Sequence, residues 1–119
     1  MPCLFTGLIP TIQSLSSKNS IVSAINKGSV TIPIGGKVVV STSSDFVLQC
    51  VSLGSPVPSV HWYKDGMLLD SKYRSVIKGL LNIPSVAPAD DGVYTCIVRN
   101  KFGVRKASTT LIVVGELYY

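Results

Sequence analysis

Two cysteines with the chain's one tryptophan between them constrain the fold more than any other feature of the sequence. Cys50 lies in the run DFVLQCVS, Trp62 follows in VHWYK, and Cys96 ends the run DDGVYTC. Such a set can belong to a catalytic thiol, a metal site or a structural scaffold. The residues around each member decide among these three roles.

All three residues fall on the apolar side of a segment that alternates like a β-strand. Residues two apart share one face of a strand, so an alternating run has one buried and one exposed face. The predicted inward sets are Phe46, Leu48 and Cys50; Val60 and Trp62; Leu81 and Ile83; Tyr94, Cys96 and Val98; and Thr109, Leu111 and Val113.

Turn signals separate these runs from Val30 onward. KDGM and NKFG are typical of tight hairpin turns. Pro33 interrupts VTIPIGGKVVV and removes a ladder donor, which predicts an edge strand there. Seven or eight short strands without a helix-period segment predict an antiparallel all-β sandwich or barrel.

Length and charge set the remaining bounds. The chain has 119 residues, enough for one domain with a core. Its net charge of +5 would suit acidic partners such as sulfated glycans, nucleic acid or anionic lipid, but at this size ordinary solubility charge is the preferred explanation. No stretch reaches the roughly 18 apolar residues of a membrane span.

The start of the chain has the weakest pattern. It is apolar but has no Lys or Arg before its apolar part, and Gly7 and Pro10 interrupt it, so it makes a poor signal peptide. We therefore expect a fragment or a misassigned start. Residues 1–28 are expected to form a disordered lead, 29–115 the domain and 116–119 a tail.

The run D-x-G-x-Y-x-C resembles the start of strand F in immunoglobulin domains. L-x-I-x-x-V is similar to strand E of that family, and N-x-x-G followed by L-x-V is similar to its F–G hairpin and strand G. The matching positions are Asp90, Gly92, Tyr94 and Cys96; Leu81, Ile83 and Val86; Asn100 and Gly103; and Leu111 and Val113. With Cys50 and Trp62, the resemblance covers residues 30–114.

The resemblance is to the intermediate, or I-set, type, because the segment from Trp62 to Leu81 is too short for the extra strands of a variable domain. It implies an immunoglobulin-like Greek-key sandwich of two antiparallel sheets. A disulfide from Cys50 to Cys96 would join the sheets, with Trp62 packed on it and Leu81 and Ile83 in the core. Within the set, IGGKVVV and GSPVPSVHWYKDG are similar to repeats of hemicentin, papilin and ADAMTS-like matrix proteins.

The resemblance also implies roles for the residues before Cys96. The Tyr94 hydroxyl would bond back to the E–F connection as a tyrosine corner. Asp90 would pair with a basic residue, for which Arg74 is the candidate. Gly92 would permit a close backbone approach. The chain departs from the family at Ser43, where a glycine usually stands, which puts the shape of that turn in doubt.

Catalytic and metal-binding alternatives fit the residues poorly. Cys3, Cys50, Cys96 and His61 could form a zinc ligand set, yet zinc motifs bring ligands in close pairs, which are missing here. A nucleophilic thiol needs a histidine in reach, whereas His61 precedes an inward tryptophan and should point outward. We predict neither enzyme activity nor a cofactor. Cys3 is left over, which suggests intermolecular pairing.

Two surfaces are candidates for binding. The first is the basic cluster around the NKFG turn, which would suit sulfated glycans or acidic loops if it is more than a solvated hairpin. Nucleic acid is not expected, because only Phe102 is interleaved with the charges. The second is the outward side of the C, F and G strands, for other proteins such as immunoglobulin-like domains, unless a neighbouring domain covers it. The basic cluster is Arg99, Lys101, Arg105 and Lys106; the outward side is His61, Tyr63, Thr95, Ile97, Ser108, Thr110 and Ile112.

The sequence thus predicts a non-enzymatic binding module for protein–protein contact in cell adhesion or the extracellular matrix. The alternative is a mechanical repeat of an intracellular muscle-type array. Retained cysteines favour an oxidising location, extracellular or at the cell surface. The absence of an N-x-S/T sequon adds no support to that location.

Overall fold

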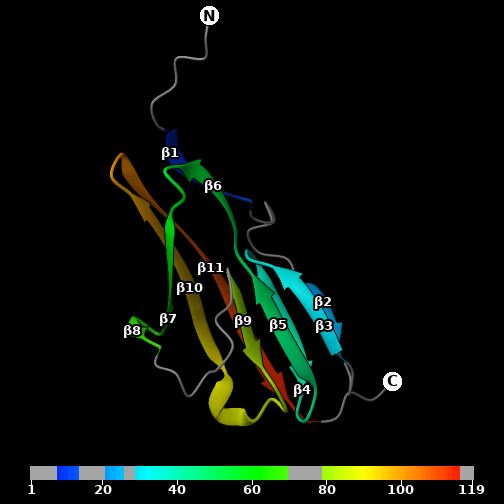
Figure 1. Ribbon diagram of the computed structural model, residues 1–119. Coiled ribbons are helices and arrows are strands. Elements are labelled where there is room, and N and C mark those ends of the chain that lie inside the picture. The colour runs from blue at the N-terminus through cyan, green and yellow to red at the C-terminus, as the bar shows by residue number, and fades with distance from the viewer. Residues whose placement is uncertain (1–7, 14–20, 26–28, 70–78, 116–119) are drawn as a thin grey trace, which may run out of the picture.

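The computed structural model describes residues 8–13, 21–25, 29–69 and 79–115, and these residues form an all-β sandwich (Figure 1). This fold class confirms the prediction. The elements are β1 Leu8–Gln13, β2 Ile21–Ile25, β3 Ser29–Pro33, β4 Lys37–Ser41, β5 Asp45–Gln49, β6 Val51–Ser55, β7 Ser59–Lys64, β8 Met67–Leu68, β9 Leu80–Ile83, the 3-10 turn η1 Pro88–Asp90, β10 Gly92–Asn100 and β11 Gly103–Val114.

Two sheets make the sandwich. One has the strand order β2-β4-β11-β10-β7-β8, and the other has the order β3-β5-β9. The central pairs β7–β10 and β10–β11 are antiparallel, whereas β2–β4, β4–β11 and β3–β5 are parallel. The prediction of antiparallel sheets is therefore wrong for these three pairings, all of which involve the strands that precede β5.

The chain changes sheets at Gly35 and Gly36, between β3 and β4. Both glycines have positive φ, 123° and 67°, which a residue with a side chain rarely adopts. The Gly35 N–H donates to the buried hydroxyl Oγ1 of Thr109 at 2.6 Å, which fixes the crossing against β11. β3 pairs only with β5, so the edge position predicted from Pro33 is confirmed.

The core lies between the sheets and follows the predicted alternation. The structure buries Phe46 and Leu48 of β5 against Leu81 and Ile83 of β9 and the inward residues of β10. The fully buried side chains include Tyr94, Phe46, Ile34, Leu48, Leu81, Ile83, Leu111, Val38, Val40, Val86, Val98 and Thr109.

The lead segment differs from the prediction of disorder. Residues 8–13 form β1, which pairs antiparallel with β6, and residues 21–25 form β2, which pairs with β4. Their partners are strands at sheet edges, whose free N–H and C=O groups accept an added strand. The structure thus places strands within the expected lead, and the described residues form eleven strands where seven or eight were expected. Cys3 and the tail 116–119 lie outside the described residues.

Candidate functional site

The disulfide pins the two sheets together at the centre of the sandwich. Cys50 and Cys96 are bonded, with 6.4 Å between their Cα atoms, and both are buried. Trp62 lies opposite Cys96 in the β7–β10 register and is 2% exposed. The predicted disulfide is confirmed. Both sulfurs are thus bonded to each other, and neither is a free thiol.

The Tyr94 hydroxyl bonds backward along the chain. Its Oη donates to the backbone oxygen of Asp90 at 2.6 Å, while the ring is completely buried. Lys64 lies over the same ring, with its Nζ 5.9 Å from the centroid, and donates to the Ala89 oxygen at 2.6 Å. These contacts hold the η1 connection against the start of β10, the geometry expected for a tyrosine corner.

Asp90 and Asp91 organise the same connection through separate backbone bonds. The Asp90 Oδ2 accepts the Ala87 N–H at 2.8 Å, across the η1 turn. The Asp91 Oδ2 accepts the Val113 N–H at 2.9 Å and so ties the connection to β11. The predicted partner of Asp90, Arg74, lies outside the described residues.

Gly92 allows the Asp65 carboxylate to lie against the backbone. Its φ is +151°, and a Cβ at this position would stand 2.7 Å from Asp65 Oδ2. The Asp65 Oδ1 accepts the Val93 N–H at 2.9 Å. The close approach predicted at Gly92 thus involves a side-chain carboxylate from the β7–β8 turn, which sequence reasoning did not identify.

Ser43 keeps the backbone conformation of a glycine. Its φ is +71°, in the left-handed region, and its N–H donates to the Val86 oxygen at 2.8 Å. The turn from β4 to β5 is therefore closed by backbone bonds despite the serine.

On the outer face of β7, β10 and β11, the predicted exposed residues lie side by side across neighbouring strands. Cross-strand partners share a face, and the register sets Ile97 between His61 and Lys106, and Thr95 between Tyr63 and Ser108. Ile97 and Tyr63 are half-buried and His61 is exposed. Ile112, the second isoleucine of the predicted face, lies opposite Val39 of β4.

Three further apolar residues belong to this face and were missed. Leu68 lies opposite Tyr63, Val93 opposite Thr110, and Val104 opposite Arg99. All three are exposed. The alternation along each strand predicts that these residues face outward. Their position beside the predicted residues follows only from the register between strands, which the sequence does not show.

The four basic residues share one end of the domain but not one face. Arg99 and Lys106 lie on the outer face, opposite Val104 and Ile97. Arg105 lies opposite buried Val98, which places it on the other side of the sheet. Lys101 is in the turn itself, with its Nζ 5.3 Å from the Phe102 ring centroid.

A side chain braces this hairpin to the neighbouring loop. Asn100 accepts the Phe102 N–H on its Oδ1 at 2.8 Å and donates from Nδ2 to the Pro56 oxygen at 3.0 Å. The Ser59 hydroxyl donates to the Arg99 oxygen at 3.3 Å. The turn and the β6–β7 loop therefore form one unit.

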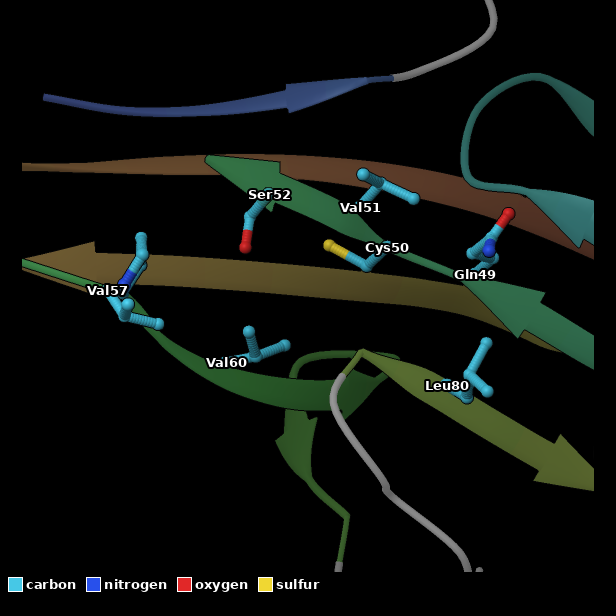
Figure 2. A pocket seen from close by; sticks show the side chains of 8 residues that line it. Gln49, Cys50, Val51, Ser52, Val57, Val60 and Leu80 are labelled. Atoms are coloured by element: carbon cyan, nitrogen blue, oxygen red, sulfur yellow. The ribbon is translucent and has the colours of Figure 1, made fainter. Parts of the chain in front are cut away.

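A hollow of about 430 Å³ opens between β5, β6, β7 and β9 (Figure 2). It is lined by Gln49, Cys50, Val51, Ser52, Val57, Pro58, Val60 and Leu80. The one cysteine in this lining, Cys50, is held in the disulfide, and no acidic or basic side chain lines the hollow with it. In the described ranges, no three His, Cys, Asp or Glu residues gather as metal ligands. No helix there is long and apolar enough to cross a membrane.

Comparisons with known proteins agree with this geometry. The family model of the immunoglobulin I-set domain matches residues 29–113. The chain is 33% identical over 107 residues to a titin homolog of Caenorhabditis elegans, covering 87% of this chain and 1% of that protein. It is 39% identical over 77 residues to mouse hemicentin-1, covering 62% of this chain and 1% of that protein. The chain therefore spans a very small part of the curated relatives it matches.

Solved structures share the fold. Titin domain M7 superimposes with a TM-score of 0.67 at 25% identity, over 92% of this chain and 97% of that one. Extracellular domains 3–5 of Drosophila OTK give a TM-score of 0.69 at 23% identity, over 90% of this chain and 32% of that one. Both similarities cover most of the sandwich described above.

Proposed function

The chain belongs to the immunoglobulin I-set domain family, and from this premise we propose that it is a non-enzymatic module that binds other proteins through the outer face of β7, β10 and β11. The observation that carries the proposal is the composition of that face. Ile97 and Tyr63 lie near its middle, with Lys106 directly opposite Ile97 and Arg99 two residues nearer the hairpin. An apolar centre with a charged rim is typical of protein interfaces.

The proposed setting is cell adhesion or the extracellular matrix, outside the cell or at its surface. The Cys50–Cys96 disulfide supports this setting, because such bonds persist in oxidising compartments. Similarity to hemicentin-1 and to the cell adhesion molecule DSCAM supports it as well. Candidate partners are other proteins, immunoglobulin-like domains among them.

A second candidate function is that of a mechanical repeat in an intracellular array. The match to the titin homolog favours it, because that match covers 87% of this chain. In this case the disulfide would be reduced in native material and the outer face would contact neighbouring repeats. The redox state of Cys50 and Cys96 therefore separates the two functions.

Binding to intact cells tests the proposed interface. Fluorescent tetramers of the chain are applied to cells of the source organism, before and after surface proteolysis. Ile97→Arg should weaken protease-sensitive binding about tenfold or more, because it places an unpaired charge at the centre of the interface. Thr31→Arg adds the same charge to exposed Thr31 on β3, in the other sheet, and is the matched control.

Two results would overturn the proposal. One is equal binding by Ile97→Arg and Thr31→Arg. The other is binding that survives proteolysis but is lost after heparinase treatment, which would assign the interaction to the basic hairpin and sulfated glycans instead.

A further inference from the structure

The described carboxylates and the basic hairpin lie at opposite ends of the domain. The four described carboxylates lie together at one end, around η1 and the starts of β5 and β10, and each accepts a backbone N–H there. The four basic residues of the β10–β11 hairpin lie at the other end (Figure 1). Among the described residues, the hairpin end therefore has four cations and no carboxylate that would repel an anionic surface.

Exposed apolar side chains lie at the same end of the domain as these cations. Val57, in the loop after β6, is 87% exposed, and Phe102, in the hairpin turn, is 43% exposed. Ile9 of β1 is 49% exposed and lies against Gly103, where a Cβ would stand 3.2 Å from Ile9 Cγ2. Figure 2 shows Val57 beside the far end of β10. Three separate segments thus contribute apolar groups to one tip.

The tip is held in place before any ligand binds. Asn100 bonds both the Phe102 N–H and the Pro56 oxygen, which fixes the positions of the segments that carry Phe102 and Val57. A pre-organised tip loses little conformational entropy on docking.

We propose that this tip, formed by Ile9, Val57, Phe102 and the four hairpin cations, docks onto an anionic lipid surface. Anionic headgroups attract each Lys or Arg near the membrane, and the boundary between headgroups and acyl chains accepts apolar and aromatic side chains. A sulfated glycan offers the charges but no apolar phase for Val57 and Phe102. The combination of exposed apolar groups and cations therefore favours the bilayer.

Vesicle co-sedimentation of the full chain tests the proposal, with phosphatidylcholine vesicles that contain or lack phosphatidylserine. Binding should require phosphatidylserine and weaken as salt rises. Changing Arg99, Lys101, Arg105 and Lys106 to Ser should lower the partition coefficient by about fivefold for each cation removed. Val57→Ser with Phe102→Ser should lower it by about tenfold while all four cations remain.

The matched control removes exposed apolar groups from the opposite end. Met67 and Leu68 of β8 are 72% and 60% exposed, so Met67→Ser with Leu68→Ser deletes a comparable area far from the tip. This variant should bind vesicles like the unchanged chain. Circular dichroism of every variant verifies that the sandwich is folded.

A fluorescent probe reports insertion directly. Phe102→Trp places an indole at the tip, while the native Trp62 is 2% exposed and contributes a constant background. Its emission should shift to the blue on vesicles with phosphatidylserine. The proposal is overturned if heparin binds and vesicles do not, if neutral vesicles bind equally well, or if the Val57 and Phe102 variant binds as tightly as the Met67 and Leu68 control.

Discussion

A single residue in the turn from β4 to β5 stores backbone strain. Ser43 has a φ of +71°, in a region where a non-glycine residue costs about 1 kcal/mol or more. We predict that Ser43→Gly raises the free energy of unfolding by about 1 kcal/mol, because glycine adopts this conformation freely. The measurement is the denaturant midpoint.

Thr42→Gly is the control for this change, since Thr42 lies in the same turn without positive φ. It should lower the free energy of unfolding by about 0.5–1 kcal/mol through chain entropy alone. A destabilising Ser43→Gly would contradict the strain assigned to Ser43.

The Tyr94 hydroxyl provides a second test on one atom. Tyr94→Phe removes the buried bond from Oη to the Asp90 oxygen and should lower the free energy of unfolding by about 1–2 kcal/mol. Binding to cells should be unchanged, because the ring lies inside the sandwich. A urea midpoint equal to that of the unchanged chain would show that the bond contributes nothing.

Inward residues could be predicted from the sequence, because a period of two fixes which side chains face the core. The hydrogen-bond partners of the carboxylates in the turns could not be predicted from the sequence. The sequence suggested Arg74 as the partner of Asp90, a residue outside those described, and it did not indicate the bond that the Asp90 carboxylate accepts from the Ala87 N–H. Likewise, nothing in the sequence connects Asp65 with Gly92, since 27 positions separate them and only the fold brings them together.

At the scale of the strand, the pairing partners were the least predictable feature. The Ser- and Asn-rich segments on either side of β2 were interpreted as linker, and nothing in the sequence of β1 and β2 names the strands with which they pair, β6 and β4. The basic cluster shows the same limit. Its residues were correctly placed around one hairpin, but their division between two faces follows from the register that sets Asn100 opposite Gly103.

The contact between β1 and β6 gives an element-scale prediction. A Cβ at Gly54 would stand 2.9 Å from Pro58 Cγ and 3.3 Å from the Pro10 Cα of β1. Gly54→Ala should therefore loosen β1 and cost about 1–3 kcal/mol of stability. Amide hydrogen exchange at Thr11 and Ile12 measures the loosening.

Gly115→Ala is the matched change, because nothing lies within 4 Å of a Cβ there. Gly115→Ala should give the same amide hydrogen-exchange rates in β1 as the unchanged chain. The placement of β1 against β6 would be contradicted if Gly54→Ala and Gly115→Ala gave the same exchange rates at these amides.

At the scale of the whole molecule, the stability of the sandwich depends on whether the protein is in an oxidising or a reducing compartment, because the disulfide contributes to that stability. The bond closes a loop between positions 46 residues apart, which restrains the unfolded chain by about 4 kcal/mol in the chain-entropy model. Trp62 lies beside it, so the centre of the core is built around an oxidised pair. A domain that works outside the cell keeps this contribution, and one in a reducing cytosol loses it.

The state of Cys50 and Cys96 in protein isolated from its native source therefore tests the account most directly. Thiols are blocked at the moment of lysis, and peptides are mapped by mass without reductant. The account of an extracellular binding module predicts one peptide pair joined through Cys50 and Cys96. Recovery of both cysteines as blocked free thiols would contradict it and favour the intracellular mechanical repeat.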